Sequence, residues 1–136
     1  LRDAAIICLA ANLANLFDRA PGRTIKVGLV GFVLLWIATT SAGLIAPTAL
    51  VIGGSIGLLV PDLREELMLG DAGSNAIGAA LGFAAVKGLA DSWLWVLLAV
   101  VALLNVASEL VSFSRVIDAV PPLRWIDRLG APHRDA

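Results

Sequence analysis

Long apolar stretches, separated by short segments that hold most of the charged residues, restrict most strongly how this chain can fold. The stretches cover residues 4–17, 27–44, 45–60, 75–89 and 93–113. A helix over residues 27–44 would be about 27 Å long, enough to cross the hydrocarbon core of a bilayer. Because lipid offers backbone groups no hydrogen-bond partners, apolar stretches of this length indicate helices, which satisfy those groups internally. The sequence therefore predicts an all-α fold, a polytopic transmembrane helical bundle with about five spans.

The composition supports this prediction and excludes several other classes. Charged residues make up 15% of the chain and hydrophobic residues 59%, whereas ordinary soluble domains contain about 25% charged residues. A net charge of −1, without a basic run interleaved with aromatic residues, excludes a nucleic-acid-binding protein. The single cysteine, Cys8, and the single histidine, His133, exclude an internal disulfide and a Cys/His metal cluster. Any metal must therefore be held by oxygen atoms.

The 136 residues fit a single membrane domain, and the start of the chain indicates a piece of a longer protein. Leu1 replaces the usual Met, and the first residues lack the basic start and the cleavage site of a signal peptide. The polar tail, residues 131–136, is expected to fray. We therefore expect residues 1–136 to be the C-terminal half of a longer membrane protein.

Five alternating spans create two sides, and the basic residues are unevenly divided between them. One side holds the loops 18–26 and 61–74 and the segment after residue 114; the other holds the remaining loops. The first side carries eight basic residues, namely Arg19, Arg23, Lys26, Arg64, Arg115, Arg124, Arg128 and Arg134, and the other carries only Arg2 and Lys87. By the positive-inside rule, the first side is cytoplasmic.

Glycine and proline residues mark where helices are expected to pack or to begin. Two glycine pairs, Gly53 with Gly57 and Gly78 with Gly82, have the spacing that lets helix backbones approach closely. Ser41, Gly43 and Pro47 mark a break between the second and third apolar stretches, with Pro47 expected in the first turn of the new helix. These two stretches should therefore form a helical hairpin.

A glycine-rich segment, LGDAGSNAIG, places a lone carboxylate just before the fourth apolar stretch. Asp71 lies between Gly70 and Gly73, and Ser74 is expected to begin the next helix. An Asp or Ser side chain in such a place can cap the free N–H groups of the first helical turn. A carboxylate at the membrane surface can instead hold a Mg²⁺ ion on which a phosphate docks. The residues alone leave both interpretations open.

A second polar motif, NLANLFDRAPGRTIK, lies at the end of the first stretch. Asn12, Asn15 and Asp18 recur at every third position, so they share one face of the helix end. Two asparagines within an apolar stretch need hydrogen-bond partners there. The three cations that follow either anchor the helix end at the membrane or contact a phosphate; they are Arg19, Arg23 and Lys26.

The last apolar stretch carries a polar stripe at helical spacing. Asn105, Ser108, Glu109 and Ser112 fall on one face of a helix whose other faces are apolar. Such a stripe should face protein or a water-filled cleft. Hydrogen bonding between helices explains the asparagine and the serines, whereas Glu109 in a bilayer must be neutralised or paired, or else has a functional role.

The order of these motifs resembles that of the polyprenyl-phosphate sugar-1-phosphate transferases. The shared features are N-x-x-N-x-x-D at a cytoplasmic helix end, a two-span hairpin, and G-D-x-G-S at the head of the next span. The superfamily includes phospho-MurNAc-pentapeptide translocase and the UDP-GlcNAc:undecaprenyl-phosphate GlcNAc-1-phosphate transferases, and this chain resembles its C-terminal half. The resemblance implies Mg²⁺-dependent transfer of a sugar 1-phosphate from a UDP-sugar to polyprenyl phosphate, at the cytoplasmic face of the bacterial inner membrane.

The resemblance also implies roles for individual residues in cell-envelope glycan synthesis. Asp71 would be the metal-binding aspartate and a catalytic residue together with Asp18. Asn12 and Asn15 would belong, with Asp18, to the pocket for the nucleotide sugar. The remaining substrate-binding candidates are the loop residues Gly70 and Ser74 and the basic residues of the same membrane side, Arg19, Arg23, Lys26 and Arg124.

Three departures from the family pattern keep a second interpretation open. Arg19 and Pro21 occupy positions where the family has a glycine and an aspartate, and Leu123-Arg124-Trp125 stands in place of a histidine-rich motif. The paired aspartates of an earlier loop would lie upstream of Leu1. The alternative is a non-catalytic relative that binds lipid phosphate or acts as a scaffold, while a transporter is disfavoured because the polar residues cluster at one membrane face. A second copy in a homodimer, or a missing N-terminal half, would complete the bundle.

Overall fold

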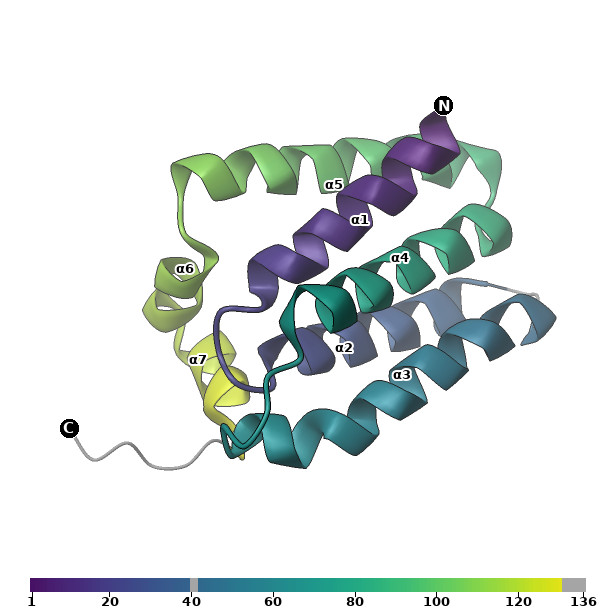
Figure 1. Ribbon diagram of the computed structural model, residues 1–136. Helices are drawn as coiled ribbons and strands as arrows, with labels where there is room; N and C mark the ends of the chain where they lie inside the picture. Colours follow the sequence, from purple (N-terminus) through teal and green to yellow (C-terminus); the bar gives the residue numbers. More distant parts are fainter. Residues whose placement is uncertain (40–41, 131–136) are drawn as a thin grey trace.

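The computed structural model describes residues 1–39 and 42–130, and within these residues it contains seven helices and no strand (Figure 1). The predicted all-α class is confirmed. Ser41 and the tail residues 131–136, with His133 and Arg134, lie outside the described residues. The five long helices are α1 (Arg2–Phe17), α2 (Arg23–Ala38), α3 (Ala42–Leu63), α4 (Gly70–Gly88) and α5 (Asp91–Leu110), and the two short ones are α6 (Phe113–Ala119) and α7 (Pro121–Arg128).

The long helices run up and down, so their connections alternate between the two ends of the bundle (Figure 1). One end holds the turn between α1 and α2, the loop between α3 and α4, and the pair α6–α7; we call it the site end. The opposite end holds the start of α1 and the α4–α5 connection, where Arg2 forms an ion pair of 2.5 Å with Asp91. The two polar motifs therefore meet at one end of the molecule, as the predicted topology requires.

Helices α1 and α4 approach closely because glycines remove side chains from their contact. A Cβ atom on Gly78 would lie 2.3 Å from the carbonyl oxygen of Ala10, and one on Gly82 would lie 3.0 Å from the Cα of Ile7. The close packing predicted for this glycine pair is confirmed. Gly53 and Gly57 of α3 have nothing within 4 Å of their Cβ positions, so this second pair does not pack against the described part of the chain.

The buried core is small and lies between α2, α3 and α4. Ile25, Ile52 and Ile77 form its centre, each at most 3% exposed. Around it, large apolar side chains point outward along the helices, including Trp36 (62% exposed) and Leu103 (68% exposed). Extended apolar surfaces of this kind mark contact with lipid or with another protein. Within residues 1–39 and 42–130, two helical segments are long and apolar enough to cross a membrane, Ala46–Leu63 and Asp91–Leu110.

Several predicted helix boundaries were wrong. Helix α2 ends at Ala38 because Thr39 adopts an extended conformation, and α3 already begins at Ala42. Pro47 therefore lies inside α3 and not in its first turn, a position that helices tolerate where neighbouring groups satisfy the freed backbone carbonyl. Helix α4 begins at Gly70, whose φ of +64° turns the chain directly into the helix. Helix α5 ends at Leu110, before an extended Val111.

Candidate functional site

The two sequence motifs are in direct contact at the site end. The hydroxyl group of Ser74, which is fully buried, lies 3.1 Å from Oδ1 of Asn15 and 2.9 Å from the carbonyl oxygen of Gly70. The first contact links the end of α1 to the first turn of α4, 59 positions apart in the chain. With Oδ1 accepting from Ser74, the amide group of Asn15 keeps its N–H donors for a ligand.

Two carboxylates flank this contact. Asp18 follows the last residue of α1 and is partly buried, and Asp71 lies in the first turn of α4 and is exposed. Among the residues the structure describes, Asp71 forms no side-chain hydrogen bond or ion pair. The residue at the N-cap of α4 is Leu69, so the capping role considered for Asp71 is not observed. The Asp71 carboxylate is therefore available to a cation or a ligand.

The environment of Asp18 disfavours its charged form. Burial raises the pKa of Asp18 above its ordinary value, and the neighbouring charges of Asp62 and Asp71 raise it further. The nearby Thr24 side chain and the backbone of Gly70 lower the pKa of Asp18 by smaller amounts than burial raises it. Three carboxyl groups are thus close enough at the site end to influence one another, and a bound cation would relieve their repulsion.

Asp62 is a site residue that the sequence did not single out. Its side chain is buried, with the residue 7% exposed, and accepts a hydrogen bond from the backbone N–H of Gly22 at 2.7 Å and another from Leu69 at 3.1 Å. Asp62 therefore joins the turn after Asp18 to the segment before Asp71. The only sequence signal was its place at the end of an apolar stretch, which does not separate it from the nearby glutamates.

The turn that Asp62 holds also depends on a glycine. Gly22 has a φ of +68°, and a Cβ atom there would lie 2.6 Å from a methyl group of Leu63. An L-residue would be strained both by this conformation and by the contact. The Pro21-Gly22 pair therefore allows α2 to begin directly beside the end of α3.

Within residues 1–39 and 42–130, no three His, Cys, Asp or Glu side chains form a group that could hold a metal ion alone. Mg²⁺ characteristically uses one or two carboxylates together with water and substrate phosphates. The donor set of Asp18 and Asp71 fits such an ion when a phosphate supplies further oxygens. It does not fit a metal that requires a closed cage of protein ligands.

The predicted basic residues are divided between two arrangements. Arg23 is buried and forms two hydrogen bonds with the carboxylate of Asp127, at 2.6 and 2.8 Å, and a third with Ser114. Lys26 donates to the backbone carbonyl groups at the end of α7. These two side chains hold α7 against α2. The other two predicted cations, Arg19 and Arg124, are exposed.

Asn12 lies away from the Asn15–Ser74 contact. Its side-chain N–H donates to Oδ1 of Asn105 at 2.6 Å, and Asn105 donates in turn to backbone carbonyl groups of Leu9 and Val101. This network joins α1 to α5, which matches the expected hydrogen bonding between helices. The predicted stripe on α5 is shorter than expected because Ser112 lies beyond the end of that helix. Glu109, the carboxylate of the stripe, is exposed.

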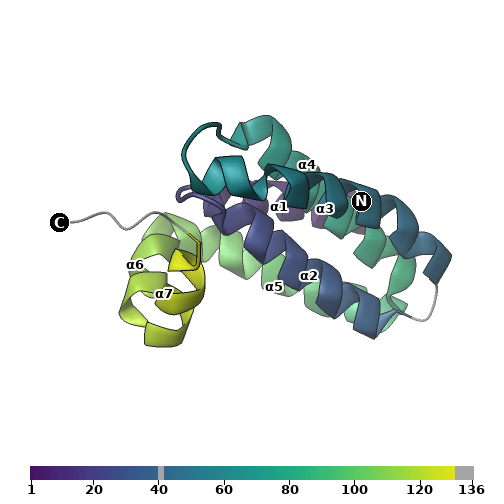
Figure 2. The same ribbon diagram turned by 90° about the horizontal axis from the view of Figure 1, so that it is seen from below.

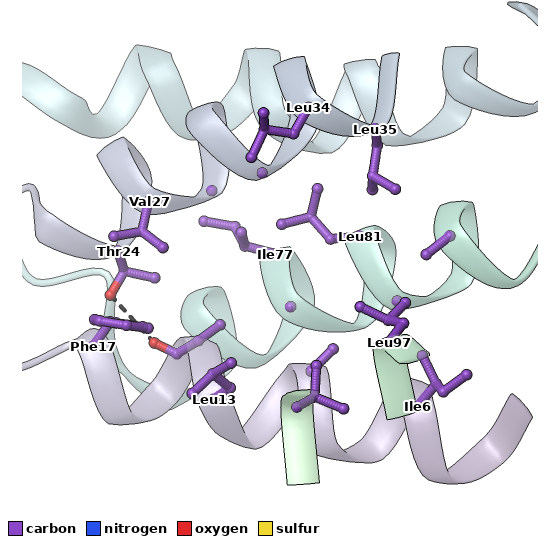
Figure 3. A pocket seen from close by; sticks show the side chains of 18 of the residues that line it. Ile6, Leu13, Phe17, Thr24, Val27, Leu34, Leu35, Ile77, Leu81 and Leu97 are labelled. Atoms are coloured by element: carbon purple, nitrogen blue, oxygen red, sulfur yellow. Dashed lines mark hydrogen bonds between the residues drawn. The ribbon is translucent and has the colours of Figure 1, made fainter. Parts of the chain in front are cut away.

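An apolar cavity of about 360 Å³ lies between α1, α2, α4 and α5 (Figure 3). Phe17 and Thr24 line it near the site end, and Ile6 and Leu35 line its far part. The Thr24 hydroxyl donates to the carbonyl oxygen of Ala14 at 3.3 Å, so it presents little free polar capacity to the cavity. The lining is suited to a hydrocarbon chain that begins next to the polar cluster.

No known protein-family model matches this chain, and neither the curated proteins nor the solved structures include one with detectable similarity to it.

Proposed function

We propose that this chain belongs to an integral-membrane transferase that moves a sugar 1-phosphate from a UDP-sugar to polyprenyl phosphate. The single observation that carries the proposal is the meeting of Asn15, Asp18, Asp71 and Ser74 at one end of the bundle, beside an apolar cavity. A polar, acidic cluster next to a hydrocarbon-lined space suits a substrate that is half lipid and half phosphate.

The membrane setting of the proposal is supported by the helices and their surfaces. Five helices of 16 to 22 residues run between two ends that differ in charge and in loop content. Helices α1 and α2 have 16 residues each, so each is about 24 Å long and would cross with its ends near the interfaces. The many outward-facing apolar side chains would then contact lipid. The site end would be the cytoplasmic one.

The proposed reaction joins two anions. An oxygen of polyprenyl phosphate attacks the phosphorus attached to the sugar, the bond to the UMP phosphate breaks, and UMP leaves. Mg²⁺, when bound, offsets the repulsion between the phosphates and stabilises charge on the transferring group. Asp18 and Asp71 would hold the ion, and the N–H donors of Asn15 would orient the nucleotide sugar. The cavity would receive the first part of the prenyl chain, with the rest in the bilayer.

Asp71→Asn tests the proposal in membranes from cells that express the gene encoding this chain. The substitution removes a carboxylate while keeping its shape, and we expect UMP release to fall by roughly 10²–10³-fold, as when charge stabilisation is lost in other enzymes. Glu66→Gln is the matched control, because it removes an exposed carboxylate from the neighbouring loop, and its turnover should be unchanged. Equal UMP release by Asp71→Asn and by the unmodified protein would show that Asp71 has no catalytic role.

A second candidate function is favoured by the exposed basic residue next to Asp18. Arg19 follows Asp18 directly, and the described residues provide no metal-binding group of three side chains. A non-catalytic relative would bind the lipid phosphate through Arg19 and would not turn over a nucleotide sugar. Polyprenyl phosphate binding without UMP release, unaffected by Asp71→Asn and weakened by Arg19→Gln, would favour this alternative.

A further inference from the structure

The pair α6–α7 forms an amphipathic unit that lies across the site end of the bundle (Figures 1 and 2). One face of α7 carries Leu123, Trp125 and Ile126, and Leu129 follows directly after the helix; all four side chains are exposed. Trp125 is the most open, at 68% exposed. So much exposed apolar surface on a unit of this size indicates that lipid or another protein covers it.

The contacts of this unit fix its depth relative to the long helices. The ring of Phe113, at the start of α6, stacks on Phe17 at the end of α1, with centroids 4.7 Å apart. Lys26, in the first turn of α2, binds the backbone carbonyl groups at the end of α7. The unit is thus held at the level where the long helices end, which in a bilayer is the headgroup layer.

The apolar face of α7 continues the outer surface of α2. A hollow of about 280 Å³ between them is lined by Val27 and Val30 of α2 together with Leu123 and Ile126 of α7. The two valines are themselves exposed. The lipid that would cover α2 in the membrane would therefore also cover the apolar face of α7.

The charges of the unit indicate the kind of surface that it contacts. The carboxylate of Asp127 is neutralised by Arg23, and that of Asp118 lies 3.9 Å from Arg128. Arg115 and Arg124 are exposed and form no ion pair with any described residue. The unit therefore presents unbalanced positive charge beside its apolar face, a combination typical of helices that bind anionic membranes.

We propose that α6–α7 is an interfacial unit that binds the headgroups of anionic phospholipids through Arg115 and Arg124, with Trp125 inserted at the headgroup level. The inference rests on the membrane topology of the proposed function but not on the transferase activity. The surface that α6–α7 contacts is one leaflet of the same bilayer that the long helices cross.

Tryptophan quenching in nanodiscs tests the inference. One variant of the whole chain keeps only Trp125 (Trp36→Phe, Trp93→Phe, Trp95→Phe), and a matched variant keeps only Trp36, which is exposed on α2. We expect lipids brominated near the headgroup to quench Trp125 about twofold more than lipids brominated at the chain ends. Adding phosphatidylglycerol to phosphatidylcholine should strengthen this quenching, and Arg115→Gln with Arg124→Gln should abolish the increase.

The matched variant separates the two proposals. If neither Trp36 nor Trp125 is quenched by brominated lipid, the membrane topology itself is wrong. If Trp36 is quenched while Trp125 is not, the topology stands and the inference is overturned. Protection of Trp125 from acrylamide without quenching by brominated lipid would indicate a protein partner and would also overturn it. Should the Phe variants fail to fold, hydroxyl-radical labelling of Trp125 in the unmodified chain, with and without phosphatidylglycerol, gives the same comparison.

Discussion

The carboxyl group of Asp18 lies where α1 ends, outside the apolar stretch, and the charges of Asp62 and Asp71 act on it. Its pKa in the folded protein is raised, mainly by burial. A raised pKa means that ionisation of Asp18 costs folding free energy. Its contribution to stability is fully present below the ordinary value of 3.8 and is lost as the pH rises through the raised pKa.

Asp18→Asn should therefore stabilise the fold at neutral pH while removing a proposed ligand. We expect the Tm in detergent micelles at pH 7 to rise by roughly 1–3 °C, a small effect because solvent screens the partly exposed group. The gain should shrink as the pH falls and vanish well below 3.8, where Asp18 of the unmodified protein is neutral in both the folded and the unfolded state. Thermal unfolding followed by circular dichroism across this pH range measures it. A gain that does not depend on pH would contradict the electrostatic explanation.

Asp62 should act on both loops of the site through its two backbone contacts. Asp62→Ala leaves the N–H groups of Gly22 and Leu69 without their acceptor, which we expect to cost about 1–3 kcal/mol of unfolding free energy. Hydrogen exchange should accelerate at these two amides. Glu66→Ala, an exposed position in the loop that follows α3, is the matched control and should leave both amides unchanged. Protection of both amides in Asp62→Ala would show that another group holds the turns.

The acidic and amide side chains of the site were predictable to different degrees. Asp71, Asn15 and Ser74 stood out because polar residues are costly beside apolar stretches. Asp62 did not, because its importance comes from accepting two backbone N–H groups that are distant in sequence. Arg23 was singled out for its charge alone, and only the structure pairs it with Asp127.

At the level of the elements, hydrophobic run length predicted five long helices, and the structure contains them. The ends were less predictable because hydropathy does not report backbone conformation. The extended Thr39 ends α2 inside an apolar stretch, and the positive φ of Gly70 starts α4 inside a segment that looked like a loop. The short helices α6 and α7 were expected only as a cytoplasmic tail, since their few apolar residues do not form a long run.

Two glycine substitutions, one inside the α1–α4 contact and one on an open helix face, test how much the close packing stabilises the fold. Gly78→Ala places a methyl group against the carbonyl oxygen of Ala10, so α1 and α4 must move apart, and we expect a loss of about 1–3 kcal/mol. Gly53→Ala adds the same group where nothing lies within 4 Å and should change the free energy of unfolding by no more than about 0.5 kcal/mol. Thermal unfolding of both variants in micelles gives the comparison. Equal stabilities would show that the α1–α4 contact relaxes without cost.

The molecule as a whole is joined across its sequence at the site end. Residues near positions 15, 23, 62 and 74 meet there, and α7 returns to α2 through the pair of Arg23 and Asp127, 104 positions apart. The sequence predicted which loops share this end, because each span reverses the chain. The sequence did not predict that α7 packs against the start of α2. That contact depends on one ion pair and on backbone carbonyl groups that accept hydrogen bonds from Lys26.

This ion pair should determine whether α7 stays docked. Asp127→Ala leaves the guanidinium of Arg23, whose side chain is only 6% exposed, without its carboxylate, and we expect a loss of about 3 kcal/mol. The double variant Arg23→Met with Asp127→Leu removes both charges, so it should lose less stability than Asp127→Ala. Thermal unfolding measures the stabilities, and hydrogen exchange in α7 should increase most in the single variant. If the double variant were less stable than Asp127→Ala, the attraction between Arg23 and Asp127 would exceed the desolvation cost of burying the two charges.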